Sequence, residues 1–205
     1  MLASTERFNI FTIKKLALCG LGLWFTSSVV WAHGFHYQIQ AGTTLQTDSK
    51  GNIQTLQMDW LYDPEVTTVM LEGEDTSPAQ QAHTLQTLRD TMLKDLHKLG
   101  YFTHLTVQDK PIALGAATTP SLTLQNQRLH LRFTLPLQQP VNLLNQRVKL
   151  ALADPDATGI LSYQDTGHIR VDTPTAITCA VTLETTAGDT GNIANHAWLD
   201  CKAPS

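Results

Sequence analysis

Alternation of apolar and polar residues at every second position is the feature that most constrains this chain. Successive strand side chains point to opposite faces, so this period is typical of a strand with one buried face. The pattern first appears in Phe35, Tyr37 and Ile39, with His36 and Gln38 on the other face. It returns over residues 56–62, 105–107, 122–124, 129–135, 148–152, 169–171 and 177–183. The sequence therefore predicts a protein built mainly from antiparallel strands, and the polar stretch 47–52 predicts a hairpin between the first two.

One segment breaks the two-residue period and predicts a helix. Ser77 is a good N-cap, Pro78 suits the first helical position, and Gln80 completes a capping box. Apolar residues then recur at steps of three and four, at Leu85, Leu88, Met92, Leu96 and Leu99. Gly100 stands where a helix commonly ends. The predicted fold class is α+β, with antiparallel sheets and one long helix packed on them.

The chain begins with the features of a secretory signal peptide. Arg7, Lys14 and Lys15 precede an apolar stretch, residues 16–25, which is far shorter than the roughly 20 residues of a membrane span. In Val30-Trp31-Ala32, the two positions that signal peptidase reads carry small or medium-sized side chains, so we expect cleavage after Ala32. The alternative is an uncleaved membrane anchor. We expect a signal peptide over 1–32 and a single periplasmic domain over 33–205.

Cleavage would leave two of the three cysteines, Cys179 and Cys201. An even number of cysteines in an exported protein predicts a disulfide, here one that closes the C-terminal segment. A thiolate metal pair is the alternative, but the two residues lie too far apart in sequence for a metal knuckle.

Charge and motifs exclude several classes of function. Residues 33–205 contain 11 basic and 17 acidic side chains, against 14 and 18 in the whole chain. This excess of acid argues against a nucleic-acid partner. The chain has no glycine-rich phosphate loop, Gly-x-Ser-x-Gly elbow or His-Glu-x-x-His motif, and no nucleophile is paired in sequence with a base. We therefore expect a protein that is not an enzyme.

Histidine is the residue type that suggests a site. Cleavage after Ala32 would give His33 a free α-amine, and His36 follows three residues later. Three nitrogen donors suit zinc, copper or nickel better than calcium or magnesium. The alternative is that both histidines simply begin the first strand. The six other histidines are scattered singly, and surface or capping roles are expected for them: His83, His97, His104, His130, His168 and His196.

Three acidic residues near the end of the second predicted strand are candidates for further metal ligands. They are Asp59, Asp63 and Glu65, which flank or follow Trp60. Their proximity to the N-terminus depends on how the first two strands pair, so it stays open at the level of sequence.

Several segments of the chain resemble the domain of unknown function family 1007. They are the histidine-bearing start, residues 60–63, 100–103 and 131–137, and Asp154-Pro155. The resemblance implies a periplasmic component of an ABC-type transport system, found beside permeases for nickel, cobalt or zinc. Members usually begin His-Pro-His, whereas this chain has His33-Gly34-Phe35-His36, and too few carboxylates precede the helix for a calcium loop.

Two hypotheses of function follow. The first is an exported accessory protein that binds a divalent transition metal ion, zinc above nickel, cobalt or copper, through His33 and His36 and serves an inner-membrane metal transporter. The second is an envelope interaction module that docks a permease, in which the histidines are incidental.

Overall fold

The first two strands form the antiparallel hairpin that the sequence predicts. In β1 (Tyr37–Thr47) and β2 (Asn52–Tyr62), Ile39 lies opposite Tyr62 and Leu45 opposite Leu56. The turn between the strands is held by Asp48, whose carboxylate accepts the backbone N–H groups of Lys50 and Asn52 at 2.8 and 2.9 Å.

Hydrogen bonds from the Asn52 side chain and backbone hold the pKa of the Asp48 carboxyl below its ordinary value.

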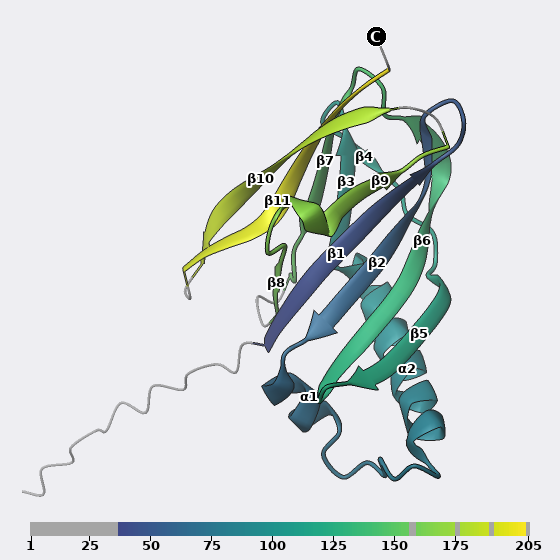
Figure 1. Cartoon of the computed structure of the whole chain (residues 1–205), viewed down its shortest axis with the longest axis vertical. Coiled ribbons are helices and arrows are strands. Elements are labelled where there is room, and N and C mark those ends of the chain that lie inside the picture. The colour runs from purple at the N-terminus through teal and green to yellow at the C-terminus, as the bar shows by residue number, and fades with distance from the viewer. Residues whose placement is uncertain (1–36, 156–158, 175–176, 189–190, 204–205) are drawn as a thin grey trace, which may run out of the picture. The chain divides into compact units, whose positions relative to one another are not determined.

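The computed structural model describes residues 37–155, 159–174, 177–188 and 191–203. Contacts divide the chain into two units, 1–33 and 34–205, and every described residue belongs to the second. Within this unit the strands form two sheets (Figure 1).

The first sheet has the strand order β5-β6-β2-β1-β8, and β9 also pairs with β1. The added strands are β5 (Thr118–Gln125), β6 (Arg128–Asn142), β8 (Gly159–Ser162) and β9 (Ile169–Asp172). β6 pairs antiparallel with both β2 and β5, as the alternation predicts. β8 and β9 run parallel to β1, which corrects the prediction of purely antiparallel sheets.

The second sheet has the antiparallel order β10-β11-β7-β3-β4. Its strands are β3 (Thr103–Val107), β4 (Lys110–Ile112), β7 (Arg147–Leu152), β10 (Thr178–Gly188) and β11 (Gly191–Lys202). Neither β4 nor β11 was predicted. A disulfide joins Cys179 and Cys201, which lie directly opposite each other on β10 and β11. The predicted bridge therefore ties the last two strands together.

The prediction of one long helix is not supported. The described residues contain two α-helices, α1 (Pro64–Met70) and α2 (Gln81–Lys98), of 7 and 18 residues. The first was missed, although Asp63 is a typical N-cap: its carboxylate accepts the backbone N–H of Val66 at 2.8 Å.

The start of the second helix also differs from the prediction. α2 begins at Gln81, and its N-cap residue, Gln80, makes no side-chain capping bond. Ser77 contributes its backbone carbonyl, which accepts the N–H groups of Gln80 and Gln81 at 2.9 and 2.8 Å. The residues from Ser77 to Gln80 therefore form a turn ahead of the helix, and the predicted capping box does not form.

Trp60 lies at the centre of the core and is fully buried. Its ring stacks on Phe102 with 6.3 Å between centroids and meets the edge of Phe133 at 5.0 Å. Tyr101 packs against Phe133 at 5.7 Å. These four aromatic residues join β2 and β6 of the first sheet to the chain segment that follows α2.

The segment that follows α2 is a left-handed turn of three residues. Gly100, Tyr101 and Phe102 all take positive φ angles, of 61, 54 and 51°. Only glycine adopts this conformation without cost, and a left-handed L-residue costs roughly 1–2 kcal/mol. Both aromatic side chains are buried, and the Tyr101 hydroxyl accepts the backbone N–H of Ala117 at 2.9 Å. Aromatic burial therefore offsets the strain of the turn.

Across the described part of the chain, no helix is long and apolar enough to cross a membrane.

Breaking the Cys179–Cys201 bridge should lower the free energy of unfolding by about 3 kcal/mol, because the bridge restricts the unfolded chain. Urea unfolding with and without a reductant measures the difference. A Cys179→Ser/Cys201→Ser double variant is the matched control and should not respond to the reductant. Equal stability of the wild-type protein in both conditions would contradict the expectation.

Replacing Gly100 by Ala should destabilise the protein by about 1 kcal/mol through backbone strain alone. A Cβ at Gly100 would meet no atom within 4 Å, so no steric clash contributes. Gly42→Ala is the control, since this glycine has no positive φ and its added Cβ would make ordinary contacts, the nearest at 3.4 Å. Thermal unfolding in which both variants match the wild type would show that the turn is unstrained.

Candidate functional site

The two predicted metal ligands, His33 and His36, lie outside the described residues. The described chain begins one residue later, at Tyr37 on β1.

Two carboxylates surround the first residues of β1. The backbone N–H of Gln38 donates to Asp63 Oδ2 at 2.8 Å, and the Asp63 N–H donates to the Gln38 carbonyl at 3.1 Å. On the other side, the Tyr37 hydroxyl donates to Asp154 Oδ2 at 3.4 Å, and the same oxygen accepts the N–H of Gly159 at 2.7 Å. The start of β1 is therefore fixed on both sides by hydrogen bonds to acidic side chains.

The three acidic candidates separate in the structure. The hairpin brings the end of β2 to the start of β1, so Asp63 lies beside Gln38. Glu65 is exposed in the first turn of α1. Asp59 lies farther along β2, opposite Gly42, with its side chain on the polar face of the first sheet. Of these three acidic residues, Asp63 is therefore the one that hydrogen-bonds to the start of β1.

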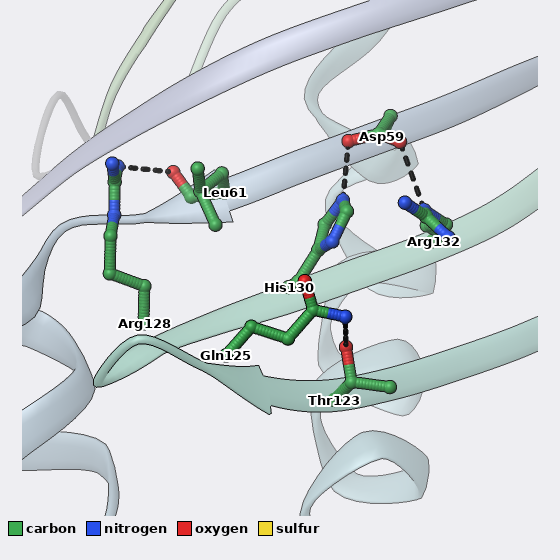
Figure 2. Close-up of polar contacts among 7 residues, drawn as sticks. All are labelled: Asp59, Leu61, Thr123, Gln125, Arg128, His130 and Arg132. Atoms are coloured by element: carbon green, nitrogen blue, oxygen red, sulfur yellow. Dashed lines mark hydrogen bonds and ion pairs between the residues drawn. The ribbon is translucent and has the colours of Figure 1, made fainter.

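Asp59 is the centre of a polar cluster instead (Figure 2). His130 Nε2 lies 2.5 Å from Asp59 Oδ1, and Arg132 Nε donates to Asp59 Oδ2 at 3.0 Å. Figure 2 shows both side chains reaching from β6 to the one carboxylate on β2. The His130 side chain is only 11% exposed, whereas that of Asp59 is 50% exposed. Both oxygens of Asp59 therefore already have protein partners.

A depression of about 450 Å³ lies next to this cluster, on the same face. Asp59 and Gly42 line it from β2 and β1, Asp165 and His168 line it from the segment between β8 and β9, and Arg170 lines it from β9. His168 Nδ1 lies 3.0 Å from Asp165 Oδ1, and this contact, with the N–H of Gly167, holds the pKa of the Asp165 carboxyl below its ordinary value. The depression is thus bordered by the Asp165–His168 pair and by Asp59, which is itself paired with His130.

Neither of these two pairs was predicted from the sequence. Asp165 and His168 are three residues apart and could have been read as a local pair. Asp59 and His130 are separated by 71 residues, and they meet only because β6 pairs with β2 in one particular register. No motif signals such a contact.

Two further histidines have environments that the structure defines. His97 Nδ1 lies 3.1 Å from the Tyr101 hydroxyl at the end of α2. Partial burial, and then the positive charge of Lys149, lower the pKa of His196, which favours its neutral form. Among the described residues, no three histidine, cysteine, aspartate or glutamate side chains are placed to hold a metal ion.

A sequence profile of the family described as protein of unknown function (DUF1007) matches residues 18–203. The chain belongs to this family. No curated protein matches the chain. Three of the segments that carry the resemblance, residues 60–63, 100–103 and 131–137, meet in this DUF1007 protein: Trp60 from β2 contacts Phe102 from the left-handed turn and Phe133 from β6. The aromatic core is therefore formed by those segments.

Asp59→Ala should lower the free energy of unfolding by about 1 kcal/mol, because His130 and Arg132 lose their shared acceptor and His130 is nearly buried. Asp90→Ala is the control: its contact with Arg89 lies on the exposed side of α2, where such pairs contribute little. Urea unfolding of both variants gives the comparison. Equal losses for the two would show that the Asp59 cluster is no more than a surface ion pair.

Proposed function

We propose that this DUF1007 protein is an exported, non-enzymatic periplasmic protein that binds a transition metal ion through His33 and His36. Zinc is the proposed ion, ahead of nickel, cobalt or copper, and the proposed partner is an inner-membrane metal transporter. In this proposal cleavage after Ala32 does two things. It releases the domain from its signal peptide, and it creates the α-amine on His33 that acts as a donor.

The chemistry of the mature N-terminus supports the proposal. An α-amine has an ordinary pKa of roughly 7.7–8.0, so a metal ion displaces its proton readily near neutral pH. The amine and the imidazole of one residue can bind the same ion, and His36 adds a third nitrogen. Borderline ions such as zinc, nickel and copper prefer nitrogen donors of this kind.

The observation that carries the proposal is where the histidines stand in the chain. His36 directly precedes β1, and Asp63 and Asp154 fix the first residues of that strand by hydrogen bonds. A metal-binding segment joined to a fixed strand has fewer conformations to lose when it binds than one on a long tether.

The proposal predicts that His33→Ala/His36→Ala weakens zinc binding at least tenfold. Calorimetric titration of the processed protein with zinc, nickel and copper measures this. His83→Ala is the matched control, because His83 is an exposed histidine on α2, away from β1. Unchanged binding by the double variant would show that the site assignment is wrong.

A permease-docking module remains the second candidate, and one observation favours it. On the second sheet, Arg147 Cζ lies 3.8 Å and Lys149 Nζ 5.0 Å from the centre of the Trp198 ring, and Trp198 Nε1 donates to the exposed Glu184 at 2.9 Å. Arg and Trp are common in protein interfaces. Capture of a permease that is equal with and without a chelator, and that Trp198→Ala abolishes, would support this candidate over metal delivery.

A further inference from the structure

One outer strand of the second sheet, β10, has a long open edge. In the strand order β10-β11-β7-β3-β4 it pairs with β11, and no other strand of the described residues lies on its far side. β10 is 11 residues long, and its pairing with β11 is regular from Thr178 to Glu184. A strand at the edge of a sheet presents unpaired backbone N–H and C=O groups, which can pair with a strand of another molecule.

The other outer strands of the two sheets carry features that prevent such pairing. β4 has three residues, two of which are Lys110 and Pro111. β5 contains Pro120, and its pairing with β6 is irregular beside Thr119, whose φ is positive. β8 and β9 have four residues each. Short length, lysine, proline and irregular pairing are the usual protections of an edge. β10 is long and has no proline, lysine or arginine, so it lacks these protections.

The pairing of Cys179 with Cys201 shows which backbone groups of β10 face the open edge. In an antiparallel ladder, pairs that exchange two hydrogen bonds alternate with closer pairs whose N–H and C=O groups point away from each other. The Cα atoms of Cys179 and Cys201 are 4.0 Å apart, which is typical of a close pair. The Cys201 carbonyl accepts the N–H of Asn145 at 2.9 Å and therefore points away from β10, as a close pair requires.

Alternation along β10 then gives the direction of the neighbouring residues. The backbone groups of Cys179, Val181 and Leu183 face the open edge, and those of Ala180 and Thr182 bond to β11. The side chains of the three odd-numbered residues pack against the core but are only partly buried. The edge therefore combines unpaired backbone donors and acceptors with apolar side chains that are incompletely covered.

The open edge is complementary to a second copy of itself. When two β10 strands pair antiparallel about a two-fold axis at Val181, the two Val181 residues lie opposite each other and Cys179 lies opposite Leu183. Every pair that must exchange two hydrogen bonds is then made of residues whose backbone groups face the edge. Val181 and Leu183 also gain apolar neighbours from the second copy, which buries apolar surface.

The one charged side chain of β10 does not oppose this pairing. In the same register Glu184 lies opposite Thr178, so the two Glu184 carboxylates stand at opposite ends of the paired segment. The Glu184 carboxylate also accepts Trp198 Nε1 at 2.9 Å within its own sheet. Like charges directly opposite each other destabilise a strand pair, and this register avoids them.

We propose that the open edge of β10 pairs with β10 of a second copy of this chain, so that two molecules share one continuous sheet across a two-fold axis. Both molecules contribute the same surface, as in most dimers with this symmetry. The Cys179–Cys201 disulfide ties β10 to β11 inside the paired segment, so the edge is ordered before association. The pairing needs no metal ion and goes beyond the function proposed above.

Sedimentation equilibrium of the processed protein tests the proposal, with a chelator present to exclude dimers bridged by metal. The wild type should be dimeric at about 100 µM, where a dimer with a micromolar Kd is populated. Val181→Pro should raise the dimer Kd roughly tenfold or more, because proline removes an N–H that faces the edge and no bond to β11.

Thr182→Lys should also raise the dimer Kd, because the two lysines would lie on one face close to the axis. It leaves the backbone of β10 intact, so it keeps the test valid should Val181→Pro fail to fold. Thr87→Lys is the matched control, since Thr87 is exposed on α2, and its Kd should equal that of the wild type.

Amide hydrogen exchange at low and high protein concentration locates the interface. Exchange at Val181 and Leu183 should slow as the concentration rises, whereas Thr182, which bonds to β11, should exchange slowly throughout. Three results would overturn the proposal: a wild type that stays monomeric at about 100 µM, a dimer that neither β10 substitution weakens, or protection of Val181 and Leu183 at every concentration. None of these measurements depends on zinc binding, so failure of the metal site and failure of the dimer are distinguishable.

Discussion

The structure depends on the burial of Trp60 between two aromatic neighbours. Trp60 comes from the middle hairpin of the first sheet, Phe133 comes from β6, and Phe102 comes from the turn after α2. A fully buried indole contributes a large apolar area, and its rings pack in the stacked and edge-to-face geometries that aromatic pairs prefer. Its Nε1 has no hydrogen-bond partner among the residues that the structure describes, which opposes this gain. Phe102 packs against Trp60 from the left-handed turn. This turn lies directly between the end of α2 and the start of β3.

The same packing shapes the region where β1 begins. Phe102 stacks on Trp60 and also lines an apolar groove of about 380 Å³, together with residues of α1 and α2 such as Val66 and Leu96. The hairpin register then brings Asp63 beside Gln38, and Asp63 both caps α1 and holds the start of β1. Helix, hairpin and aromatic core therefore all contribute to fixing the strand that directly follows His36.

Most of the longer strands could be predicted because a half-buried strand alternates in sequence, whereas β4, β8 and β11 were missed. The Cys179–Cys201 pair could be predicted because the expected export, and the two cysteines that the expected cleavage would leave, both favour a bridge. The predicted start of α2 was wrong because Ser77 accepts hydrogen bonds through its backbone carbonyl and does not cap the helix with its hydroxyl. The sequence pattern does not distinguish these two arrangements. The parallel pairing of β8 and β9 with β1, and the meeting of Asp59 with His130, depend on tertiary register across long stretches of chain. Local periodicity carries no information on such contacts.

The central claim is that processing creates a metal-binding N-terminus on a folded domain. The most direct measurement is intact mass, N-terminal sequence and metal content determined together on protein purified from the periplasm under native conditions. The account predicts a chain that begins at His33, an intact Cys179–Cys201 bridge and about one zinc ion per molecule, lost when His33 and His36 are replaced. A chain that retains residues 1–32, or a processed chain that carries no transition metal when zinc is supplied, would contradict it.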